Sequence, residues 1–206
     1  MRRVRAIPIL IVALFLAATS VRVGASMVMQ FDLAQMCARA HLIVRGTILS
    51  SDPGTIAVGG GQLPIVTYRV QVDETFRGEV QEVKGVRIAQ LRMLGKSSPV
   101  RSGNLISASP LPKMPTLTVG HTYLLFTTQP SAVGLSATVG LGQGSFSIYR
   151  EGKDELAVNE ANNSGLFRDM NLTSVRARAS SATTLSVAGP IAYDELARQI
   201  RAALGK

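Results

Sequence analysis

Val66-Thr67-Tyr68-Arg69-Val70-Gln71-Val72-Asp73 is the stretch of sequence that decides the fold. Apolar residues occupy every second position and polar residues occupy the positions between them, which is the period of a strand with one buried face. Phe76-Arg77-Gly78 follows and ends the run. The pattern predicts a β-strand that belongs to a sheet covered on one side.

Other short segments on both sides of this stretch also have strand character. From Leu42 to Ile48, alternate residues point to opposite faces, whereas Tyr123-Leu124-Leu125-Phe126 is apolar on both faces and predicts a central strand. Val86-Arg87-Ile88 begins a further strand, with a bulge or a strand end where the apolar phase slips before Leu91. The remaining candidates are residues 135–141, 146–148 and 156–158.

A helix is predicted on each side of these strands. Asp32 and Gln35 have the spacing of a capping box, which predicts a short helix through Ala40. Cys37, the only cysteine, is interpreted as a small apolar residue on the buried face of that helix. Near the C-terminus, residues 190–205 predict an amphipathic helix that Gly205 ends. Its apolar stripe consists of Tyr193, Leu196, Ala197, Ile200 and Leu204.

Three segments are expected to connect these elements without regular structure. Residues 50–62 are rich in Gly and contain Pro53, and residues 92–118 contain four prolines, so both are predicted to be loops. Residues 159–189 have few large apolar side chains and are expected to be loosely ordered.

The predicted fold is all-β: a small OB-like five-stranded barrel with a short N-terminal helix and a C-terminal amphipathic helix. We expect one domain, since the chain has 206 residues. Residues 26–158 would form the barrel, residues 159–189 the loosely ordered excursion, and residues 190–205 the helix that packs on the barrel.

The first 25 residues have the pattern of a cleaved signal peptide. Arg2, Arg3 and Arg5 precede an uncharged apolar run, and Val23-Gly24-Ala25 suits signal peptidase. A membrane anchor is the alternative, but the run of about a dozen residues is shorter than the roughly 20 that span a bilayer. We therefore expect cleavage between Ala25 and Ser26, a secreted or periplasmic location, and no transmembrane segment after cleavage.

The order of these features resembles a known family. A short helix precedes His41-Leu42-Ile43-Val44-Arg45-Gly46, then Tyr68 to Gly78 follows, and then Val119-Gly120-His121-Thr122-Tyr123-Leu124-Leu125. This order is similar to the tissue-inhibitor-of-metalloproteinases and netrin-like OB domains, especially their cysteine-poor bacterial exported members. In the animal inhibitors, a free N-terminal cysteine chelates the zinc of the protease. The expected mature chain begins at Ser26, so no residue here carries that mechanism.

Catalytic and metal-binding patterns are not found in the sequence. His41 and His121 begin two predicted strands, but two histidines without a neighbouring cysteine or carboxylate pair do not make a metal site. Gly95-Lys96-Ser97 imitates the end of a phosphate-binding loop, yet Gln90 stands where that loop requires glycine. The sequence therefore predicts no metal, no cofactor and no enzymatic activity.

The middle of the chain contains a long segment whose charged residues are all basic. No acidic residue lies between Glu82 and Glu151, whereas seven basic residues lie from Lys84 to Arg150. The predicted contact residues are Arg92, Lys96, Arg101 and Lys113. A positive field favours an anionic partner, although acidic residues elsewhere in the chain are able to balance it. The scarcity of stacking aromatics and the expected export argue against nucleic acid as the partner.

The sequence therefore predicts an exported, non-enzymatic interaction module that binds an unidentified extracytoplasmic protein or an anionic surface. Two alternatives stay open. One is a modulator or inhibitor of an extracytoplasmic metalloprotease that acts by a non-chelating contact. The other is a hydrolase whose site is assembled from residues distant in the sequence.

Overall fold

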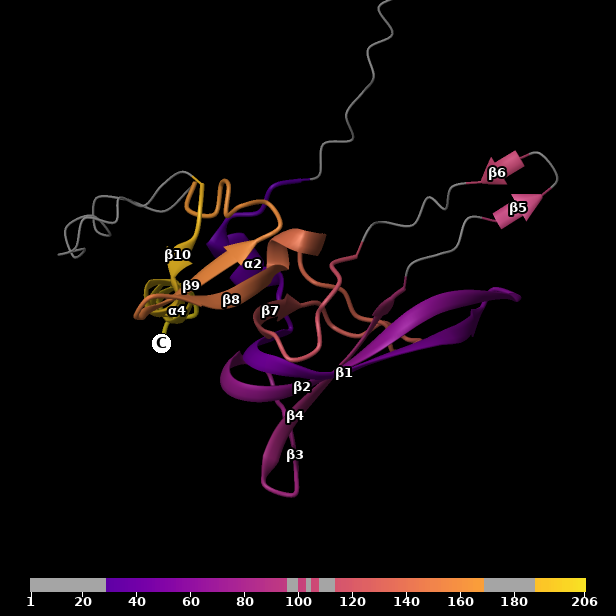
Figure 1. The fold of residues 1–206 in the computed structure, drawn as a ribbon, viewed down its shortest axis with the longest axis horizontal. Coiled ribbons are helices and arrows are strands. Elements are labelled where there is room, and N and C mark those ends of the chain that lie inside the picture. The colour runs from indigo at the N-terminus through magenta and orange to yellow at the C-terminus, as the bar shows by residue number, and fades with distance from the viewer. Residues whose placement is uncertain (1–28, 96–99, 103–104, 108–113, 169–187) are drawn as a thin grey trace, which may run out of the picture.

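The structure is a computed structural model that describes residues 29–95, 100–102, 105–107, 114–168 and 188–206; for residues 100–102 and 105–107 it describes the backbone only. The fold is mostly β (Figure 1). Its elements are α2 (Leu33–Arg39), β1 (Leu42–Val58), β2 (Gly61–Arg77), β3 (Gln81–Val83), β4 (Val86–Leu94), β5 (Val100–Ser102), β6 (Leu105–Ser107), β7 (Thr122–Thr127), the 3-10 helix η1 (Leu141–Gly144), β8 (Ser145–Glu151), β9 (Asp154–Asn159), β10 (Ile191–Ala192) and α4 (Tyr193–Ala203).

The predicted closed five-stranded barrel is not confirmed, because the sheet is open. Eight antiparallel strands follow one another in the order β10-β9-β8-β7-β1-β2-β4-β3, and β5 pairs only with β6. Closure of the five central strands would require β8 to pair with β4. In the part of the chain that the structure describes, β8 pairs instead with β9, and the edge of β4 is partly occupied by β3.

Two hydrophobic cores lie on opposite faces of β1 and β7. Ile43, Leu124 and Phe126 belong to the first core, whereas Val44 and Leu125 belong to the second. These five side chains are fully buried. The prediction that 123–126 form a central strand is confirmed, since β7 lies between β1 and β8. The second core also holds the inward residues Tyr68, Val70 and Val72 of the stretch that predicted β2.

The two helices cover the first core. The predicted capping box is present in α2, where Asp32 accepts a hydrogen bond from the backbone of Gln35. At the other end of α2, Arg77 of β2 donates to the carbonyl oxygens of Cys37 and Ala40, at 2.5 Å and 3.2 Å. A cation there also complements the helix dipole. Four residues of the predicted apolar stripe are buried in α4, whereas Leu204 follows the helix and is only partly buried. The helix begins at Tyr193 and not at residue 190 as predicted, because Ile191 and Ala192 pair with β9.

The prediction of a loop over residues 50–62 is wrong. β1 and β2 continue through this region as a paired arm that extends beyond the rest of the sheet (Figure 1). Gly59 and Gly60, with φ of 58° and 78°, make its two-residue turn. β7 pairs with β1 only as far as Thr47, so beyond this point one edge of β1 is not paired with β7. Pro53 lies on this part of β1. Proline has no backbone N–H to donate, and it is tolerated where that position of the strand faces an open edge.

Two other strand predictions also differ from the structure. β4 pairs with β2 without a register shift, so no bulge follows Ile88; Ile88 lies on the opposite face from the buried Ala89 and Leu91. Residues 135–141 form only an isolated bridge between Thr127 and Thr138 before η1. Of the predicted excursion over 159–189, Asn159 ends β9, residues 160–168 are turns with a buried Leu166, and residues 169–187 lie outside the described residues.

Candidate binding site

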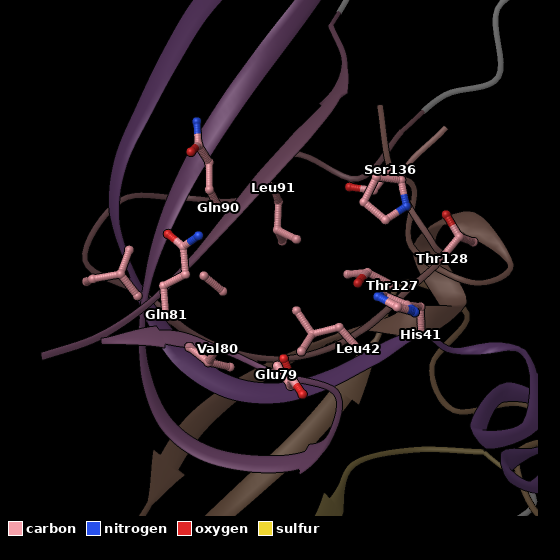
Figure 2. Close-up of a pocket in the computed structure, with 13 residues that line it drawn as sticks. His41, Leu42, Glu79, Val80, Gln81, Gln90, Leu91, Thr127, Thr128 and Ser136 are labelled. Atoms are coloured by element: carbon pink, nitrogen blue, oxygen red, sulfur yellow. The ribbon is translucent and has the colours of Figure 1, made fainter. Parts of the chain in front are cut away.

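A cavity of about 240 Å³ lies between β4 and the end of β7 with the segment that follows it. Its walls are β4, the segment between β2 and β3, the start of β1, and residues 127–136 after β7. Figure 2 shows Leu91 of β4 and Leu42 of β1 pointing into the cavity from opposite sides. Both pack on the second core, as does Val80. The cavity therefore has an apolar floor.

Polar and exposed residues form the rim above this floor. They are His41, Glu79, Gln81, Gln90, Thr128 and Ser136. His41, Glu79, Gln81 and Gln90 are exposed, so the cavity opens to solvent on their side. Sequence reasoning considered His41 only as a metal ligand and missed the others, because the residues that line the cavity come from four separate segments.

The edge of β4 supplies backbone groups to this cavity. The tight turn at Lys84 and Gly85, both with positive φ, makes Val83 and Val86 a hydrogen-bonded pair. In an antiparallel ladder such pairs recur at every second residue, so Val86, Ile88, Gln90 and Arg92 direct their N–H and C=O groups away from β2. Two hydrogen bonds agree with this alternation. On the side away from β2, the Ser136 N–H donates to the Arg92 carbonyl at 2.8 Å; on the side toward β2, the Gly95 N–H donates to the Pro64 carbonyl at 2.9 Å.

Gln90 is left without a backbone partner on this edge. The β3 ladder ends at Ile88, and the contact from Ser136 reaches Arg92. Between these two points, no described residue pairs with the N–H or the C=O of Gln90. We call this gap, bounded by β4 residues 88–92 on one side and residues 127–136 on the other, the seam.

Arg92 does not lie in a loop as predicted, since it belongs to β4 opposite Thr67. Its guanidinium reaches the second wall of the seam, where a Cβ added to Gly134 would be 3.5 Å from its Nη1. Among the described residues, no carboxylate makes a salt bridge with it. Arg92 thus places a positive charge at one end of the seam, whereas Glu79 lies at the cavity rim on the β2–β3 side.

The other predicted contact residues are Lys96, Arg101 and Lys113. Arg101 lies in β5, of which only the backbone is described, and Lys96 and Lys113 lie outside the described residues. The expected cleavage site at Ala25 and Ser26 also lies outside them. The end of the predicted 92–118 loop packs on the sheet, because Leu117 is buried in the second core and its N–H donates to Tyr68 Oη at 3.4 Å.

The structure places acidic residues beside part of the basic segment. Arg87 of β4 lies directly opposite Glu82 of β3. Arg150 lies 3.5 Å from Glu155 across β8 and β9. The one-signed run in the sequence is therefore interrupted in space at these two positions.

A second polar cluster lies on the other face of the sheet and fixes α4. The guanidinium of Arg45 lies 4.3 Å above the ring of Tyr193 and 3.0 Å from Glu155. The Tyr193 hydroxyl donates to Glu74 at 2.6 Å, and Arg201 also pairs with Glu74. Burial and the hydrogen bond to Glu74 raise the pKa of Tyr193. Because these groups are engaged with each other, we interpret the cluster as the attachment of α4 to the sheet.

The remaining candidates for chemistry are separate from one another. His41 and His121 lie at opposite ends of the antiparallel pair β1–β7. The described residues contain no group of three or more His, Cys, Asp and Glu side chains that would hold a metal ion. Cys37 is buried, and burial raises the pKa of its thiol to about 11, so the thiol is protonated at neutral pH.

No protein-family model, no curated protein and no solved structure matches this chain. Within the described residues, no helix is both long and apolar enough to cross a membrane.

Proposed function

We propose that the protein is an exported, non-enzymatic interaction module and that it binds another protein at the seam. The observation that carries the proposal is the unpaired backbone of Gln90 beside a cavity of about 240 Å³ that has an apolar floor and a polar rim. One water molecule needs only about 10–15 Å³, so the cavity has room for side chains of a partner. Protein-binding sites commonly combine an apolar centre with a polar rim.

The expected leader in residues 1–25 supports export to a secreted or periplasmic location. A protein partner is favoured over an extended anionic surface, because Arg87 and Arg150 have acidic neighbours and the cavity floor is apolar.

We also infer an OB-like relationship for the five strands β8-β7-β1-β2-β4. Their consecutive order supports it, since they would close as a barrel if β8 paired with β4.

An affinity capture tests the proposed function. Mature protein from Ser26 to Lys206 is immobilised beside a Val80→Lys variant, and exported proteins are captured and identified by mass spectrometry. We expect a partner that the wild-type protein retains and Val80→Lys loses, because a charge at the apolar floor must be desolvated on binding. Val83→Lys is the matched control, since Val83 follows shortly after Val80 in the sequence, is exposed at the tip of the β3–β4 hairpin and does not line the cavity.

The charge prediction is tested in the same capture. A chain with Arg92, Lys96, Arg101 and Lys113 replaced by Glu is expected to lose a salt-sensitive partner while it stays folded. Circular dichroism confirms the fold of each variant. Capture of the same proteins by the wild type and by the folded Val80→Lys variant would contradict binding at the seam.

A further inference from the structure

We infer that the ligand of the seam is an extended peptide segment that adds to the edge of β4 as a short strand. This inference rests on the proposed function and names the chemistry of the partner. A free strand edge binds extended peptides through main-chain hydrogen bonds, and cavities for alternate side chains give the specificity. The seam supplies both parts: the unpaired N–H and C=O of Gln90, and the apolar floor formed by Leu42, Val80 and Leu91.

The length of the free edge limits the peptide. Ile88 is paired with β3, and the carbonyl of Arg92 is bonded to Ser136, so Gln90 is the one position between them that is open. Residues 88 and 92 are about 13 Å apart along a strand at 3.3 Å per residue. A peptide therefore fits with one residue paired to Gln90 and with a side chain next to it directed to the floor. We assign an aliphatic side chain to this position, because Leu42, Val80 and Leu91 offer it apolar contacts.

The charges at the ends of the seam select the flanking residues. Arg92 has no carboxylate partner among the described residues, and its guanidinium lies beside Gly134 at one end. Glu79 is exposed at the cavity rim. A peptide with an acidic group at the Arg92 end complements this arrangement, and an aliphatic residue lies at its centre.

Binding of a library of acetylated and amidated hexapeptides to the mature protein tests this inference, with dissociation constants measured by fluorescence polarisation. We expect the bound sequences to share a central aliphatic residue and an acidic residue at one end. N-methylation of the paired amide should weaken binding at least about tenfold, since it removes a backbone hydrogen bond and adds bulk. The Arg92→Glu variant should prefer peptides with a basic residue at this end instead of an acidic one.

Two substitutions at one position separate the backbone from the side chain. Gln90→Pro removes the N–H that faces the seam and leaves the ladder to β2, so we expect a loss of affinity of at least about tenfold. Gln90→Ala keeps the N–H and removes only the rim side chain, so it should lose much less affinity than Gln90→Pro, and the difference between the two variants reports the backbone hydrogen bond. If Gln90→Pro does not fold, the N-methylated peptides give the same test.

Equal binding of the methylated and unmethylated peptides would overturn strand addition, as would the absence of binding by any library member. Strand addition would then be wrong even where the capture with Val80→Lys still supports a protein partner at the seam. If Val80→Lys and Val83→Lys captured the same partner proteins, the proposed function itself would be overturned.

Discussion

Replacing Gly46 with alanine is expected to lower the free energy of unfolding by about 3 kcal/mol, at the upper end of what overpacking costs. A Cβ at this position would lie 2.2 Å from the carbonyl oxygen of Gln71 and 2.8 Å from a methyl of Val70. Gly46 is buried between β2 and β7, at a register shift of β1. The backbone of β2 cannot move away without disturbing the second core. Denaturation by urea measures the change.

Gly54→Ala is the matched control, because Gly54 belongs to the same strand β1. A Cβ there would meet only the side chain of Ile65, at 3.6 Å, which is an ordinary contact. We expect its free energy of unfolding to stay within about 1 kcal/mol of the wild-type value. Similar losses in both variants would show that Gly46 is not the point of close approach between β1 and β2.

Asn163→Ala is the second substitution with a large expected effect. The buried Asn163 amide accepts from the N–H of Asn159 at 3.0 Å and donates to the carbonyl oxygens of Ala157 and Gly189, at 2.9 Å and 2.8 Å. It therefore ties the end of β9 to the chain that enters β10. Alanine would leave these backbone groups unpaired, and each unpaired buried group costs about 1–3 kcal/mol. We expect a loss of about 3 kcal/mol in the free energy of unfolding.

Asn162→Ala controls for the backbone conformation. Asn162 and Asn163 both have positive φ, 52° and 57°, so alanine meets the same strain at either position. Asn162 is exposed, and its side chain makes no hydrogen bond within the described part of the chain. Thermal unfolding of the two variants should thus differ clearly. Equal melting temperatures would contradict the role given to the Asn163 amide.

Patterns between residues close in the sequence correctly predicted β2 and the start of α2. The alternation from Val66 to Asp73 predicted β2, and the spacing of Asp32 and Gln35 predicted the cap of α2. The arm at 50–62 was missed because its Gly and Pro content is typical of loops, whereas its strands are held by pairing with each other. Backbone pairing of that kind leaves no mark in hydrophobic periodicity.

The candidate site was less accessible to sequence reasoning. Arg92 was predicted as a contact residue from its charge and from a predicted loop over 92–118, whereas the structure places it in β4 at one end of the seam. Leu42, Val80 and Leu91 form the floor together only because β1, β2 and β4 curve around the second core. Leu42 and Leu91 were assigned to separate predicted strands, and Val80 was not singled out. The open edge at Gln90 depends on where the β3 ladder ends, which residue types do not reveal.

Amide hydrogen exchange of Gln90, followed by NMR in the free mature protein, tests the open seam most directly. The N–H groups of Ala89 and Leu91 point toward β2, and the N–H of Gln90 points into the seam. We predict that Gln90 exchanges much faster than Ala89 and Leu91, and that a bound peptide slows it. Protection of Gln90 equal to that of its two neighbours in the free protein would mean that the edge of β4 is already paired, and would contradict the binding site.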